Sequence, residues 1–437
     1  MLMRGGVTAS RIVVANGTFA ITRRTMFRKL FWTPSDPLVA RGYLYALADA
    51  QRQYDVELHH GTLVPTHEHL TVTPRKDNLP MFMRHVHRES ARFLQEHLLA
   101  RGYDAPENVW DSRSAHTMRL LGAGAQLEWV LYEHLNVVAA GLVERVSDYP
   151  GWTSDLGLMK GGLVVVKKPP LYFSKSKPDE LTLRFTPPPV LARAFDGDLD
   201  ALVHWMRRSV RDMEDAYRDE RRAKGMGVVG AAKIKRTHPF AEPRTPRERR
   251  GRLVPTFKIG QLGDEDEARE LRKHCAGERR LFLSEHRESY LMWRGGERTV
   301  SFPAGEYGMR VFHGASVAAP MSDAVLCVGD DLDAVEVASA EARREMFEAV
   351  REAVRADGEE DAEPLAELAD STDGARPAGA SEDPSDVPPG PDEPPEPPPS
   401  RPPAHAMPLA SPSLTAQIEH PARITTLRTR LDRGPPE

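Results

Sequence analysis

Two strand-like runs in direct succession, VELHHGTLVP (56–65) and THEHLTVTP (66–74), place the strongest constraint on the fold. Around this pair lie one more strand-like run, at 12–24, and three stretches with apolar residues at helical spacing, at 35–54, 79–102 and roughly 125–146. Ser35 and Asn78 stand where helix N-caps are expected. The order favours a compact α+β fold, in which an antiparallel sheet carries its helices on one face.

Charge is unevenly distributed along the 437 residues. Fourteen acidic residues and one basic residue lie between 356 and 400, so the rest of the chain carries a net charge of +8, against −5 for the whole. Between Arg218 and Lys258 there are thirteen Lys or Arg and four Asp or Glu. The positive net charge outside residues 356–400 indicates a polyanionic partner, although solubility alone would also explain it. The basic segment is equally well read as a nucleic-acid contact or as an exposed linker.

Composition divides the chain into three parts. The first 155 residues show regular patterns, and residues 156–355 form a mixed, largely helical and basic extension without a motif of assignable role. Residues 356–437 are rich in Pro, Asp and Glu, which predicts a disordered tail. Two cysteines, Cys275 and Cys327, predict no disulfide framework and a cytoplasmic setting. Uninterrupted apolar runs stay well short of 18 residues, so a membrane span is not expected.

His67 and His69 stand one residue apart in the second strand-like run. Side chains alternate along a strand, so both imidazoles share one face and lie about 6–7 Å apart at Cα. They can converge on one divalent metal ion. Taken alone, the pair favours hydrogen-bonded or solvated histidines over a metal site.

Tyr132 and Asn136 form a second pair, one helical turn apart in WVLYEHLNVVAAGLVERVSDYP (129–150). Helical spacing places them at the border of the apolar stripe that packs on the sheet. A boundary tyrosine with its hydroxyl in water is the simpler reading of this position.

The two pairs together resemble the REP-associated tyrosine transposases, a branch of the single-tyrosine HUH transposases. That family has a Pro-x-His-x-His strand, a helix with Tyr-x-x-x-Asn-Pro-Val, and an aromatic-Pro-aromatic ending. Corresponding segments here are PTHEH (65–69), YEHLNVV (132–138) and YPGWT (149–153), and the resemblance covers residues 10–155. It implies a ferredoxin-like HUH nuclease fold for this part of the chain.

The resemblance also implies a mechanism and a set of partners. His67, His69 and Asn136 would hold Mg²⁺ or Mn²⁺, and Tyr132 would attack single-stranded or hairpin DNA to leave a 5′-phosphotyrosine. Such a protein would nick and rejoin DNA during transposition, as a monomer or a homodimer. Phosphate contacts are expected from five arginines, namely Arg23, Arg24, Arg84, Arg88 and Arg92.

Three departures from the family pattern leave alternatives open. Glu68 stands between the histidines where the family has an apolar residue, and it points to the expected core side, where an unpaired carboxylate is costly. Val137 replaces the family's Pro, and Thr66 replaces its Asn. A catalytically decayed DNA-binding protein is therefore an alternative. An unrelated metallohydrolase that also uses His59 and His60 is a weaker one.

Overall fold

The computed structural model describes residues 12–112, 115–241, 256–260 and 265–319. The tail expected at 356–437 lies outside this part of the chain. Within it, no helix is both long and apolar enough to cross a membrane.

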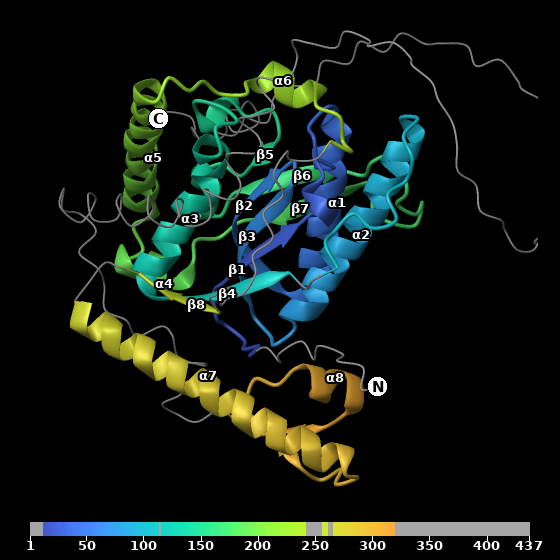
Figure 1. Cartoon of the computed structure of the whole chain (residues 1–437), viewed down its shortest axis with the longest axis vertical. Coiled ribbons are helices and arrows are strands. Elements are labelled where there is room, and N and C mark those ends of the chain that lie inside the picture. The colour runs from blue at the N-terminus through green and yellow to red at the C-terminus, as the bar shows by residue number, and fades with distance from the viewer. Residues whose placement is uncertain (1–11, 113–114, 242–255, 261–264, 320–437) are drawn as a thin grey trace, which may run out of the picture. The chain divides into compact units, whose positions relative to one another are not determined.

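A six-stranded sheet in the order β5-β2-β3-β1-β4-β8 organises the structure (Figure 1). Its strands are β1 (Phe19–Arg24), β2 (Val56–Val64), β3 (His67–Pro74), β4 (His116–Leu121), β5 (Trp152–Thr153) and β8 (Phe257–Ile259). Neighbouring strands run antiparallel, except that β8 pairs in parallel with β4. The mixed α+β fold with a mostly antiparallel sheet is as expected from the sequence.

Helices cover both faces of this sheet, so the expectation that they pack on one face is wrong. Ile21 and Leu70 point into a core shared with α1 (Pro37–Tyr54) and α2 (Leu79–Ala100). The neighbouring positions, such as Ala20 and Leu120, point the other way into a core shared with α3 (Gly122–Ala139). Successive side chains of β1 therefore point alternately into two separate hydrophobic cores.

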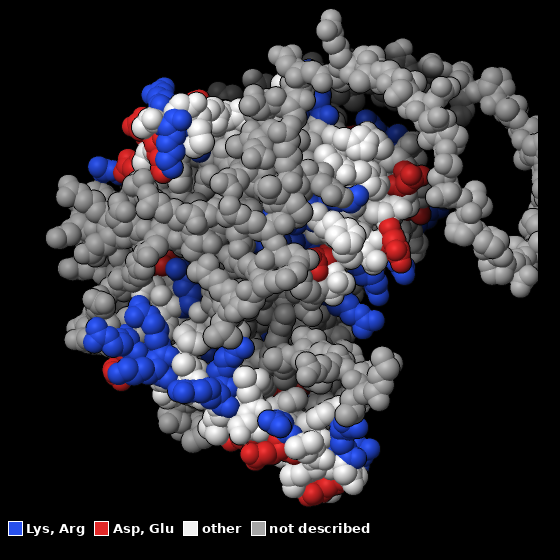
Figure 2. Space-filling model, viewed as in Figure 1, with Lys and Arg blue, Asp and Glu red and all other residues white. Residues whose placement is uncertain are grey.

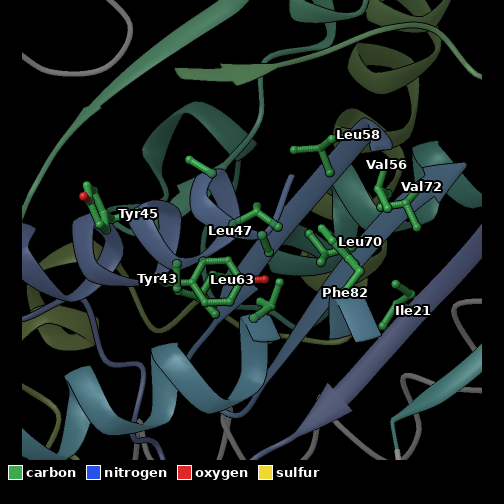
Figure 3. Close-up of a cluster of buried hydrophobic side chains, with 14 of the residues drawn as sticks. Ile21, Tyr43, Tyr45, Leu47, Val56, Leu58, Leu63, Leu70, Val72 and Phe82 are labelled. Carbon is green, nitrogen blue, oxygen red and sulfur yellow. The ribbon is translucent and has the colours of Figure 1, made fainter. Parts of the chain in front are cut away.

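The core between the sheet and α1/α2 is built from aliphatic and aromatic side chains that interdigitate (Figure 3). Strands β1, β2 and β3 contribute Ile21, Val56, Leu58, Leu63, Leu70 and Val72, and the helices contribute Tyr43, Leu47 and Phe82. Helix α1 begins one residue later than expected, because Asp36 rather than Ser35 caps it and accepts a hydrogen bond from Leu38 N.

The extension contains helices and a strand hairpin, and part of it shares a core with α3. Strands β6 (Leu163–Lys167) and β7 (Glu180–Arg184) pair as a hairpin. Two helices of the extension are separated near Gly197, whose φ is +77°. They are α4 (Pro189–Ala194) and α5 (Leu199–Ala223), and both pack in the same hydrophobic cluster as α3.

The remaining elements are one long helix and several short pieces. The helices and strands are α6 (Ala231–Arg236), α7 (Glu265–Arg294), β9 (Ser301–Phe302), α8 (Gly308–His313) and β10 (Ser316–Val317). Short 3-10 turns occupy Met26–Arg28, Val146–Asp148 and Leu156–Lys160.

Gly42 lets α1 approach α2 closely, and its replacement by alanine tests this packing. A Cβ at Gly42 would overlap the Phe93 ring. We expect Gly42→Ala to lower the free energy of unfolding by about 1–3 kcal/mol in urea denaturation, despite its better helix propensity. Gly277→Ala in α7 is the matched control, because a Cβ there meets no described atom within 4 Å. It should be neutral or stabilising by up to ~1 kcal/mol, and an equal effect of both substitutions would contradict the close packing.

Candidate metal and nucleophile site

Strand β3 turns His67 and His69 toward α3. Their ring centres are 4.6 Å apart, and both side chains are buried. Asn136 and Tyr132 come to the same place from α3, so the structure brings the four predicted residues together. The Tyr132 ring centre lies 5.4 Å from that of His69.

Threonine hydroxyls hold both imidazoles by the same ring nitrogen. Thr66 Oγ1 lies 2.9 Å from His67 Nδ1, and Thr22 Oγ1 lies 2.9 Å from His69 Nδ1. An Nδ1–H that donates to a hydroxyl leaves Nε2 with its lone pair, which is how metal-binding histidines are commonly oriented. Thr66, a departure from the family pattern, thus orients His67.

Each of the three predicted ligands has one buried polar atom without a hydrogen-bond partner within the described structure. These atoms are Nε2 of His67, Nε2 of His69 and Oδ1 of Asn136. Leaving buried polar atoms unpaired costs about 1–3 kcal/mol each. Two imidazole nitrogens and one amide oxygen are a donor set suited to a divalent metal ion with free coordination positions. Among the described residues, no cluster of three or more His, Cys, Asp or Glu could hold a metal ion, at this site or elsewhere, so the candidate site depends on the Asn136 oxygen as its third ligand.

The site keeps both histidines uncharged. Burial is the main cause that lowers the pKa of His69 to about 3, and the nearby Arg24 guanidinium adds to it. Burial also lowers the pKa of His67 well below 6.5, helped by His69 and Arg24, while the adjacent Asn136 side chain opposes the shift. At neutral pH both imidazoles are therefore in the form that binds metal.

Tyr132 is more deeply placed than its sequence position predicts. It was expected at the border of the helix–sheet interface, but only 4% of it is exposed, because α3 is buried on all sides from Gly122 to Val138. Trp129 packs against it, with ring centres 4.8 Å apart, and also lies 6.2 Å from the His69 ring. The phenol ring is thus held between an indole and a candidate ligand.

Glu133 anchors this arrangement, a role that no sequence pattern indicated. One carboxylate oxygen accepts from Trp129 Nε1 at 2.8 Å, and the other accepts from the Thr71 hydroxyl at 2.8 Å and lies 3.2 Å from His60 Nδ1. His60 Nε2 is in turn 3.1 Å from His134 Nδ1. Burial raises the pKa of Glu133 and lowers the pKa of His60 to about 3, so the pair is kept neutral.

A β-bulge in β2 places His60 where it can reach α3. The register with β3 shifts between Leu58 and His60, so one extra residue, His59, is inserted. His59 also hydrogen-bonds on this side of the sheet, with Nε2 2.7 Å from Thr73 Oγ1. Adjacent histidines of a regular strand would instead point to opposite faces.

Glu68 is paired on the opposite face of the sheet. Its carboxylate contacts His87 Nε2, a residue of α2. Arg23 lies opposite Glu68 in the β1–β3 register, and its guanidinium contacts His87 Nδ1 at 3.3 Å and the Asp111 carbonyl at 3.0 Å. The uncommon carboxylate therefore belongs to a buried polar network and not to the Tyr132 site.

The five arginines predicted to contact DNA fall into two groups. Arg24 lies opposite His67 in the β1–β3 register, on the face of the site. Arg23 lies on the other face, and Arg84, Arg88 and Arg92 are exposed on α2, which also covers that other face. The structure brings only Arg24 to the four central residues.

Comparisons with known proteins find limited likeness. No family model matches the chain, and no curated protein sequence matches it. A REP-associated tyrosine transposase bound to a REP hairpin is similar at 20% identity and a TM-score of 0.28, over 34% of this chain and 81% of that one. A putative transposase from Deinococcus radiodurans R1 is similar at 22% identity and a TM-score of 0.19, over 27% and 85%. At these values, the case for a function rests on the geometry of the site.

His59 makes stability depend on pH. Burial lowers its pKa from 6.5 to about 4 in the folded chain, so the unfolded chain takes up a proton first as the pH falls. The folded chain should lose about 2 kcal/mol through this residue between pH 7 and pH 5. We expect His59→Gln to show a smaller loss between these pH values in urea unfolding, whereas His204→Gln, an exposed control on α5, should behave like the parent. Identical pH dependence in all three proteins would contradict the assignment.

Proposed function

We propose that this chain is a metal-dependent nuclease and strand transferase of transposase type, acting on single-stranded or hairpin DNA. Tyr132 is the nucleophile, and His67, His69 and Asn136 hold Mg²⁺ or Mn²⁺. The observation that carries the proposal is the set of three unpaired donor atoms, on these three residues, beside a buried phenol. Other buried side-chain atoms of the described residues are unpaired as well, but these three belong to side chains that lie together and are of the types that bind divalent metal ions.

The donor set fits a divalent ion, which when bound would polarise the scissile phosphate. Tyr132 forms a bond from its phenolic oxygen to phosphorus, and the bond from phosphorus to the 3′ oxygen breaks. The phenol loses its proton and the departing 3′ oxygen gains one, leaving a 5′-phosphotyrosine and a 3′-hydroxyl. The phosphodiester energy is retained in the adduct, so a second DNA end can be joined without ATP.

The residues around Tyr132 restrict the orientation of its ring and place a positive charge near the histidines. Trp129, held by Glu133, packs on Tyr132 and limits the orientations of the phenol ring. Arg24 places a positive charge on the side of the two histidines, where a phosphate would lie. Because Tyr132 is almost fully buried, a DNA strand reaches it only after neighbouring side chains move aside.

The decayed DNA-binding protein remains the second candidate, and the structure weakens its main support. Glu68 is the main departure that suggests a decayed site. Its carboxylate pairs with His87 on the face of the sheet that α2 covers. Tyr132, His67, His69 and Asn136 lie close together, which supports the proposal, and Val137 is buried in α3.

A labelled hairpin oligonucleotide incubated with Mg²⁺ or Mn²⁺ tests the proposal. The full chain should form a covalent protein–DNA adduct that resists denaturant and vanishes in Tyr132→Phe. Tyr103→Phe, a half-buried tyrosine outside the site, is the matched control and should retain the adduct. Chelation of the metal should abolish adduct formation as well.

The other outcomes separate the alternatives. Tight hairpin binding by the parent chain without an adduct would favour the decayed protein. DNA hydrolysis that persists in Tyr132→Phe would exclude Tyr132 as the nucleophile. It would favour the unrelated metallohydrolase instead.

A further inference from the structure

Helix α7 carries a straight row of positive charge. At about 100° per residue, five exposed cations fall within about 60° of one another around the helix. They are Arg269, Lys273, Arg280, Arg287 and Arg294. Figure 2 shows Lys and Arg side chains gathered over the N-terminal half of this helix.

The buried residues of α7 and its glutamates between 269 and 294 lie on other sides of the helix than the cationic row. Cys275, Phe282 and Ser289 are buried and recur every seven residues, about 150° away from the cations. The four glutamates between 269 and 294 lie at about 100° to 180° from Arg269, so none falls within the row. Lys273 reaches sideways to one of them, Glu270. A face that is merely solvated typically mixes the two signs, whereas this row carries a single sign along its whole length.

We propose that this cationic row binds the phosphate backbone of duplex DNA that flanks the hairpin acted on at Tyr132. From Arg269 to Arg294 the row spans about 37 Å, close to one turn of B-DNA at about 34–36 Å. Arginine and lysine in this arrangement give strong, sequence-independent and salt-dependent affinity. The choice of DNA rests on the proposed function, whereas the row itself lies outside residues 10–155.

The test measures how DNA affinity depends on salt, in EDTA so that no cleavage interferes. The variant is Lys273→Gln, Arg280→Gln and Arg287→Gln combined in the full chain. Its matched control combines Arg207→Gln, Arg208→Gln and Arg211→Gln, three exposed cations of α5. The probes are a hairpin alone and the same hairpin with about two helical turns of duplex.

For the duplex-flanked probe, the slope of log K against log salt should fall in magnitude by about 3 in the α7 variant, roughly one for each phosphate that the substituted side chains no longer neutralise. The control variant should keep the parent slope, and the hairpin alone should be much less affected. An unchanged slope, or an equal fall in both variants, would overturn the proposal.

Adduct formation on the short hairpin separates this inference from the proposed function. The α7 variant should still form the Tyr132 adduct at saturating hairpin. If the parent chain forms no adduct while the slopes differ as expected, the DNA-binding row stands and the nuclease fails.

Discussion

Burial on both sides of β3 is the constraint on which the site depends. All eight residues of this strand are buried, between β1 and β2 within the sheet and between helices above and below it. Each polar side chain on β3 must therefore find a partner on its own face. Glu68 finds His87 of α2 on one face, and Thr71 finds Glu133 of α3 on the other.

Among the residues described, His67 and His69 each have a hydrogen-bond partner for only one of their two ring nitrogens. Each uses Nδ1 on a threonine hydroxyl and leaves Nε2 unpaired within the described structure, next to the unpaired Oδ1 of Asn136. Within the described residues, Glu68 Oε2 on the other face of β3 is unpaired too, but on the face of α3 the three unpaired atoms lie together on metal-binding side chains, and we interpret this grouping as a site kept for binding. The cost of three unpaired atoms is offset when a cation accepts their lone pairs.

Local patterns predicted much of the first half of the chain. Alternation and helical spacing located β2, β3, α1 and α2 to within a few residues, and they placed His67 and His69 on one face. Strand β4 was missed because its six residues carry little periodicity of their own. Coverage of both faces was missed because the apolar stripe of α3 indicates that the helix packs on the sheet but not which of the two faces it covers.

The partners of the buried polar groups could not be predicted, since they come from distant positions. Glu68 meets His87 across the sheet–helix interface, and His60 meets Glu133 only because a bulge in β2 turns it. A bulge depends on the pairing register and leaves no clear mark in a single sequence. The convergence of Tyr132 and Asn136 on the two histidines was implied by the family resemblance, but the residue patterns alone did not predict it because it depends on the packing of α3.

The central claim is that His67 and His69 hold a metal ion through Nε2. Electron spin echo spectroscopy of the full chain with bound Mn²⁺ tests it directly, because nitrogen nuclei bonded to manganese modulate the echo. We predict coupling to imidazole nitrogen that disappears in the combined His67→Ala and His69→Ala variant and persists in His204→Ala. Manganese bound without nitrogen coupling, or with coupling that survives the double substitution, would contradict this claim.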